Sequence, residues 1–147
     1  MDRLSEVLNT FISIGNVDEL KVPELAGRRY LGQRKNGHCE VWVEERCPNP
    51  TSREQVTIRR RKLPKRWDLW NHSPTGFEWG YGGSGPAQLA LAILADSLGN
   101  DDKAICFHQR FKWEFVSRFE DQWQLSLKHI QDFISGQERG AGLRLVK

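Results

Sequence analysis

Six basic side chains and two tryptophans in one short stretch are the residues of this sequence best suited to bind a charged partner. Cations occupy six of the eight positions from 59 to 66. Single-stranded nucleic acid is bound by cations that contact its phosphates and by aromatic rings that stack on its bases. The stretch predicts a nucleic-acid or acidic protein partner, bound by Arg59, Arg60, Arg61, Lys62, Lys65, Arg66, Trp67 and Trp70. The alternative is that the cations solvate a strand edge and the tryptophans fill the core.

A glycine-rich turn offers a second kind of chemistry. Residues 80–85 match the spacing G-x-G-x-x-G and open an apolar helical segment, whose free N–H groups and dipole can bind phosphate. The candidate phosphate or nucleotide ligand would contact Gly80, Gly82, Gly83, Ser84, Gly85 and the nearby His72. A dinucleotide fold also needs a parallel strand after the helix, and here a second helix is expected instead. The competing interpretation is that the glycines only permit close backbone packing.

Ser84 also lies in a sequence close to a nucleophile elbow, although Pro86 replaces the final glycine of that motif. His72 could act as its base, with Asp68 or Glu78 orienting the imidazole. Because the motif is incomplete, a hydrolase is the less favoured interpretation, and a helix-capping role for Ser84 is simpler. The histidines and three cysteines match no zinc-ligand spacing, so we predict no metal, no cofactor and no catalytic residue.

Composition limits the class of protein that positions these residues. A chain of 147 residues, with 38% hydrophobic and 28% charged residues, suits one globular domain. Three unpatterned cysteines favour a reducing compartment, and neither a signal peptide nor a membrane-spanning run is expected. We therefore expect a cytoplasmic protein. Its net charge of +3 is small for a dedicated nucleic-acid binder.

The N-terminal half should supply a helix and then strands. Apolar residues at helical spacing follow Asp2 and stop at Gly15, so residues 1–27 are predicted to be a helix and linker. From residue 28 the apolar residues alternate, and Asn36-Gly37 predicts a type I′ hairpin. Residues 47–52 are predicted to be a loop because they contain two prolines, and a third strand is expected around Val56 and Ile58.

The C-terminal half should supply helices. Residues 86–98 are apolar nearly all round and predict a buried helix, followed by a second helix from Asp101 or Asp102 to Phe119. Trp123 and Leu125 predict a short extended piece, and Ser126 can cap a last helix. We expect an α+β domain over residues 28–135, with an antiparallel sheet of two or three strands packed on two or three helices, and a flexible tail over 136–147.

The stretch NHSPTGFEWGYGGSGPAQLALAIL, residues 71–94, resembles the signature of an uncharacterised bacterial and phage family of unknown function. The similarity extends from about Arg28, through Leu63-Pro64 and Phe111-Lys112-Trp113, to about Phe133. The resemblance implies a small protein of phages or other mobile elements and no assigned activity. In that setting it implies handling of nucleic acid, or inhibition of a host defence through protein binding.

The sequence thus favours a non-enzymatic binding protein that contacts nucleic acid or an acidic protein surface through the basic, tryptophan-flanked stretch. Phosphate or nucleotide binding at the glycine-rich turn is the alternative. The N-terminal amphipathic helix could join two copies of the chain into an oligomer.

Overall fold

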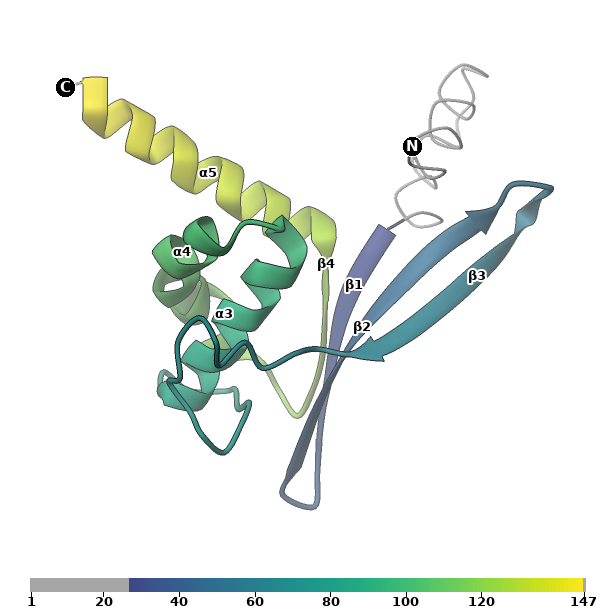
Figure 1. Ribbon diagram of the computed structural model, residues 1–147, viewed down its shortest axis with the longest axis horizontal. Helices are drawn as coiled ribbons and strands as arrows, with labels where there is room; N and C mark the ends of the chain where they lie inside the picture. Colours follow the sequence, from purple (N-terminus) through teal and green to yellow (C-terminus); the bar gives the residue numbers. More distant parts are fainter. Residues whose placement is uncertain (1–26, 147) are drawn as a thin grey trace.

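A computed structural model describes residues 27–146 of the chain. These residues form an α+β fold in which a four-stranded antiparallel sheet packs against three α-helices (Figure 1). The predicted N-terminal helix, and the oligomer that it could mediate, lie outside the described residues. The elements are β1 (Gly27–Lys35), β2 (His38–Asn49), β3 (Ser52–Lys62), α3 (Ser84–Leu98), α4 (Asp101–Glu114), the 3-10 helix η2 (Val116–Arg118), β4 (Gln122–Ser126) and α5 (Leu127–Val146).

The sheet has the strand order β3-β2-β1-β4, so the prediction of two or three strands was too low. The additional strand is β4, the stretch predicted only as a short extended piece. It pairs with β1, and Tyr30 lies opposite Leu125. This pairing joins segments far apart in the sequence, so no hairpin turn marks it. Only the folded chain brings β4 to the sheet.

The Asn36-Gly37 hairpin is confirmed. Lys35 pairs with His38 across a two-residue turn, and Asn36 and Gly37 have φ angles of 53° and 76°. Positive φ at both central residues is the geometry of a type I′ turn, which matches the twist of the flanking strands.

The loop predicted for residues 47–52 is shorter than expected. Strand β2 continues to Asn49 and β3 begins at Ser52, with an irregularity in register between Pro48 and Asn49. Pairing between β1 and β2 ends at Arg46, so Pro48 has a paired strand on one side only. A proline that lacks an N–H is tolerated at such an edge position.

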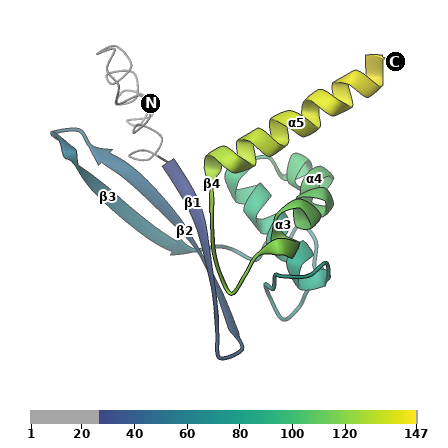
Figure 2. The ribbon, with the colours of Figure 1, turned by 180° about the vertical axis from the view of Figure 1, so that it is seen from behind.

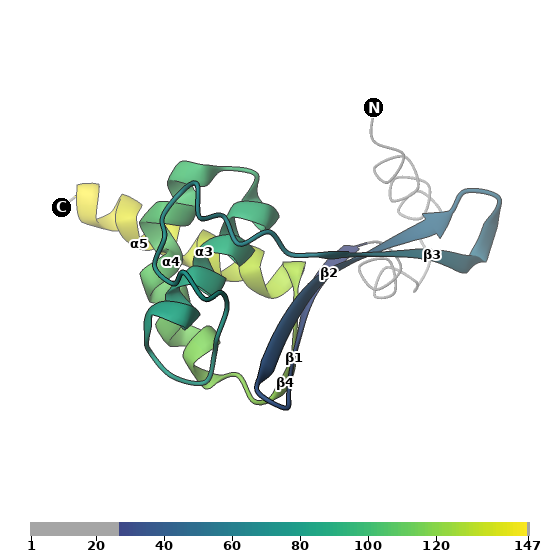
Figure 3. The same cartoon turned by 60° about the horizontal axis from the view of Figure 1, so that its bottom comes forward.

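The three helices cover one face of the sheet, and no described helix covers the other (Figures 1 and 2). The buried helix predicted for residues 86–98 is confirmed as α3, in which Leu89, Leu91, Ile93 and Leu94 are fully buried. The β2–β3 hairpin extends beyond the helical layer (Figure 3). The core therefore lies between α3 and the inner face of the sheet.

The second predicted helix ends earlier than expected. Helix α4 begins at Asp101 as predicted but stops at Glu114 rather than Phe119, and η2 follows. The carbonyl of Val116 accepts a hydrogen bond from the Gly80 N–H, a tertiary contact that sequence periodicity does not report. Ser126 caps α5 as predicted, its hydroxyl accepting the His129 N–H.

Helix α5 continues to Val146. Residues 136–146, predicted as a flexible tail, are therefore helical, and their mobility stays a prediction. None of the helices within residues 27–146 is both long and apolar enough to cross a membrane.

Candidate functional site

The basic stretch does not form one surface. Strand β3 alternates its side chains between the two faces of the sheet. Arg60 and Lys62 lie on the open face, opposite Glu44 and Trp42 of β2, whereas Arg61 lies on the face that carries the helices. The basic residues of this stretch are therefore divided between two sides of the molecule.

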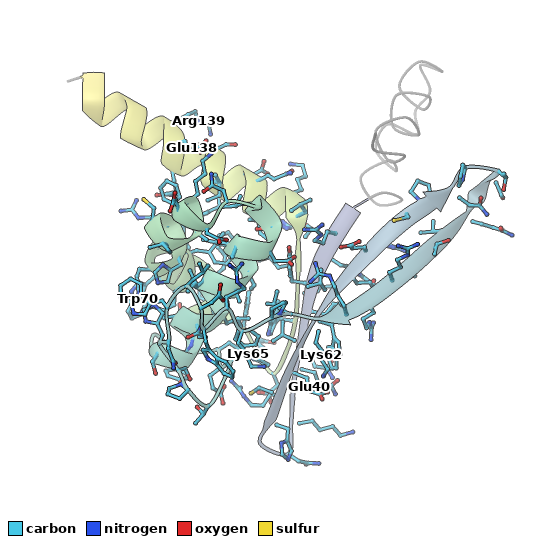
Figure 4. All side chains as sticks on the ribbon, in the orientation of Figure 1. Glu40, Lys62, Lys65, Trp70, Glu138 and Arg139 are labelled. Atoms are coloured by element: carbon cyan, nitrogen blue, oxygen red, sulfur yellow. The ribbon has the colours of Figure 1, made fainter. Side chains whose placement is uncertain are left out.

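On the open face, two cations contact one tryptophan. The Lys62 ammonium lies 4.6 Å from the centroid of the Trp42 ring, and the Arg60 guanidinium carbon lies 5.7 Å from it. Lys62 also donates to Glu40 at 3.0 Å. Figure 4 shows Lys62 and Glu40 close together on the sheet, whereas Trp70 lies on the far side of the helices. Trp42, which the sequence prediction missed, is thus the aromatic partner of these cations.

Glu44 holds the guanidinium groups of this face in place. Glu44 is only 2% exposed, and its carboxylate accepts hydrogen bonds from Arg29 at 2.7 Å and from Arg60 at 2.9 Å. Burial raises the pKa of Glu44, but the hydrogen bonds from Arg60 and Arg29 outweigh burial and leave that pKa below its ordinary value. Glu44 therefore stays ionised at neutral pH.

A shallow groove of about 520 Å³ lies beside these cations on the open face. Leu31 and Trp42 give it an apolar floor, and three glutamines place amide donors and acceptors along it. Its lining residues are Leu31, Gly32, Gln33, Trp42, Arg60, Gln122, Trp123 and Gln124. The groove combines the Trp42 ring, the Arg60 cation and side-chain amides, which are the kinds of group that bind unpaired bases and phosphates.

The other predicted cations make contacts within the fold. Arg61 donates to Asp96 at 2.8 Å, and Arg66 pairs with Asp68 and Asp101 at 3.1 and 3.0 Å. Lys65 lies 4.7 Å above the Phe77 ring. Arg59, which lies on β3 with Arg61, is exposed.

The two predicted tryptophans lie apart from Arg60 and Lys62. The Trp67 indole N–H donates to the Ser73 carbonyl, and the Trp70 ring stacks on His72 with centroids 4.6 Å apart. Both rings are nonetheless about half exposed, at 45% and 50%. Trp70 therefore belongs to a second group of residues, centred on His72.

Tight packing explains most of the glycine-rich turn. A Cβ atom at Gly82 would lie 2.0 Å from the Trp113 ring, and one at Gly85 would lie 2.5 Å from the Glu78 Cβ. Gly80 has a φ of 89°, which disfavours other residues. The N-cap of α3 is Gly83, so Ser84 is not the cap that the sequence suggested. The glycines thus allow close packing within the fold.

His72 forms a hydrogen-bonded pair with His108 of α4, their Nε2 atoms 2.9 Å apart. His108 Nδ1 lies 2.7 Å from the Ile105 carbonyl, which can only accept. The neutral His108 therefore carries its proton on Nδ1, and His72 Nε2–H donates to His108 Nε2. Burial lowers the pKa of both imidazoles, and nearby Lys112 lowers both further.

Gln88 positions the loop that carries His72. Its side chain is fully buried in α3; its Oε1 accepts the N–H groups of His72 and Ser73, and its Nε2 donates to two loop carbonyls. The sequence prediction missed Gln88, His108 and Lys112. The spacing of His108 and Lys112, four residues apart on one helix, was the available signal for these two.

The hydrolase arrangement is not assembled. Glu78 is paired with Arg34 and Asp68 with Arg66, and within residues 27–146 no hydrogen bond joins Ser84 to His72. Nor does the described part of the chain contain a group of three or more His, Cys, Asp or Glu side chains that could hold a metal ion.

The fold and sites define an α+β protein whose four-stranded sheet carries an open groove on one face. Residues 30–136 match the family described as Family of unknown function (DUF6166), and the chain belongs to that family. Trp42, Lys62, His72 and Lys112 all lie within the matched residues. No curated protein and no solved structure matches the chain.

Proposed function

We propose that this protein binds single-stranded nucleic acid on the open face of its sheet. The observation that carries the proposal is Trp42, which lies beside a groove with Arg60 and Lys62 against its ring. Bases stack on such rings with little sequence preference, and cations beside them contact the phosphates. An acidic protein surface would pair with the cations but would make fewer hydrogen bonds to the three glutamines of the groove than bases would. Nucleic acid is therefore the favoured partner.

The ion pairs close to Trp42 support a moderate affinity. They contain three positive charges, from Arg29, Arg60 and Lys62, and two negative charges, from Glu40 and Glu44. A phosphate that reaches Lys62 or Arg60 therefore competes with an internal carboxylate, and binding should be strongest at low salt. The cytoplasmic location and the role in mobile elements or against host defence rest on sequence alone and belong to this proposal.

Fluorescence anisotropy with a labelled single-stranded oligonucleotide, measured over a salt series, tests the proposal. Replacing Arg60 and Lys62 with Gln should weaken binding and reduce the log–log salt slope by about 1.4, since each phosphate contact on a single strand contributes about 0.7. Trp42→Ala should cost about 1–3 kcal/mol of binding while leaving the slope unchanged.

Lys103 and Lys128 provide the matched control, because both are exposed lysines on helices. Replacing them with Gln removes the same charge and should leave the slope within error. Equal loss in both double variants, or no binding to DNA or RNA at low salt, would overturn the nucleic-acid assignment.

A further inference from the structure

Lys112 is a buried cation without a counter-charge. The residue is 7% exposed, and its ammonium makes one long hydrogen bond of 3.4 Å to the Gly82 carbonyl. It also lies 4.6 Å from the centroid of the Trp113 ring. Among the carboxylates whose side chains the structure describes, none lies within 4.0 Å of this ammonium. A buried charge is costly unless an opposite charge accompanies it, so a bound anion would offset the cost of burying Lys112.

The groups around Lys112 also favour an anion. Gly82 immediately precedes the N-cap of α3, a helix with no acidic residue in its first turn and no side-chain cap. The first N–H groups of a helix have no partner within it and carry partial positive charge. His108 lies one helical turn before Lys112 and is hydrogen-bonded to His72. Donors and a cation therefore converge here.

Exposed aromatic rings surround the same residues. Trp70, Tyr81 and Trp113 are 50%, 51% and 58% exposed, three of the five large hydrophobic side chains exposed in the described part of the chain. Trp70 stacks on His72, while the missing side chains of Gly82 and Gly83 leave room for the Trp113 and Tyr81 rings. Exposed aromatic rings can stack on a planar base, and a cation beside them can contact the phosphate attached to that base.

We propose that Lys112 and the Ser84 and Gly85 N–H groups in the first turn of α3 bind the phosphate group of a nucleotide, whose base contacts the exposed rings of Trp70, Tyr81 or Trp113. The phosphate supplies the charge that Lys112 lacks within the protein. The site involves the helices and the loop before α3 rather than the open sheet face, so it does not depend on the proposed single-strand surface.

Thermal unfolding in sodium phosphate, compared with sodium chloride at equal ionic strength, tests the anion site. Phosphate should raise the wild-type Tm above its value in chloride, because a ligand that binds only the folded state stabilises it. Lys112→Met keeps the length of the side chain and removes its charge. This variant should have a Tm in chloride at least equal to that of the wild type and should show no phosphate effect.

Lys128→Met, on the exposed face of α5, should keep the full wild-type response to phosphate. Amide chemical shifts provide a readout that needs no variant: phosphate should move the Ser84 and Gly85 signals of the wild-type protein. Equal Tm values in phosphate and chloride, unmoved signals at these amides, or a phosphate response that survives Lys112→Met would each overturn the site.

Three further ligands identify what carries the phosphate: 5′-AMP, a 5′-phosphorylated trinucleotide, and the same trinucleotide without the phosphate. Tighter binding of 5′-AMP indicates a free nucleotide, and tighter binding of the phosphorylated trinucleotide indicates the end of a strand. We expect the unphosphorylated trinucleotide to bind at least tenfold more weakly than its phosphorylated form. Equal binding of these two, or binding of 5′-AMP no tighter than inorganic phosphate, would overturn the nucleotide proposal.

Discussion

Gln88 and Lys112 are both buried polar side chains, yet their surroundings differ. Gln88 makes four hydrogen bonds to backbone groups of the preceding loop, so its burial leaves nothing unpaired. Lys112 has one long hydrogen bond and no carboxylate partner within the described residues. The first arrangement explains how the loop is held in place, whereas the second is the reason for the anion site proposed above.

The paired imidazoles predict a loss of stability in weak acid. Folding lowers the pKa of His72 and His108 below the ordinary value of 6.5, chiefly through burial. Below pH 6.5 the unfolded chain then binds more protons than the folded chain, so the free energy of unfolding falls as the pH falls toward the folded pKa values. Each imidazole contributes a slope of up to about 1.4 kcal/mol per pH unit.

Urea denaturation at several values between about pH 7 and pH 5 measures this slope. His108→Leu should flatten it, because the most buried imidazole is gone and His72 loses its imidazole neighbour. His129→Gln, at an exposed histidine of α5, should leave the slope as in the wild type. A wild-type slope that survives His108→Leu would show that other groups dominate acid unfolding.

At the scale of single elements, the start of α3 predicts different tolerance at neighbouring glycines. A Cβ atom at Gly85 would lie 2.5 Å from the Glu78 Cβ and 3.2 Å from the Glu78 N, so backbone would have to move. A Cβ atom at Gly83 would instead meet the Tyr81 ring, which is half exposed and can rotate. Gly85→Ala should therefore destabilise the protein by about 1–3 kcal/mol, and Gly83→Ala by less than about 1 kcal/mol.

Chemical denaturation of both variants checks this order. Neither substitution introduces a polar group, and each adds one methyl group to the same turn, so each is the control for the other. If Gly83→Ala were the more costly substitution, the turn would be held by the Tyr81 ring rather than by contact between α3 and the Glu78 backbone.

At the scale of the whole molecule, Asp96 of α3 connects the helical layer to the sheet. Its carboxylate accepts the Tyr30 hydroxyl at 2.7 Å and the Arg61 guanidinium at 2.8 Å, and it also lies 3.4 Å from Arg28. Asp96→Ala should lower the free energy of unfolding by about 2–3 kcal/mol, because the buried Tyr30 hydroxyl loses its acceptor.

Urea titration of Asp96→Ala beside Asp132→Ala measures this contribution. Asp132 is exposed on α5 and pairs only with Lys128 among the described residues, so its removal should change stability by no more than about 0.5 kcal/mol. Similar effects of the two substitutions would mean that apolar packing alone holds α3 on the sheet.

The sequence by itself determined the features that depend on local geometry. Asn36-Gly37 requires a turn with positive φ, the residues from 86 to 98 have no polar side to expose, and Ser126 is suited to cap α5. Such features depend on residues a few positions apart, and their periodicity or turn chemistry is visible in the chain.

Only the tertiary structure decided which distant residues meet. It added β4 to the sheet and brought Trp42 to the two cations. Because side chains alternate between the two faces of β3, it also separated Arg60 and Lys62 from Arg61. It also joined His72 to His108 and buried Lys112 beside the glycine-rich turn. These contacts form because the whole chain buries one common core. Which distant residues meet depends on the packing of that core and not on any local signal in the sequence.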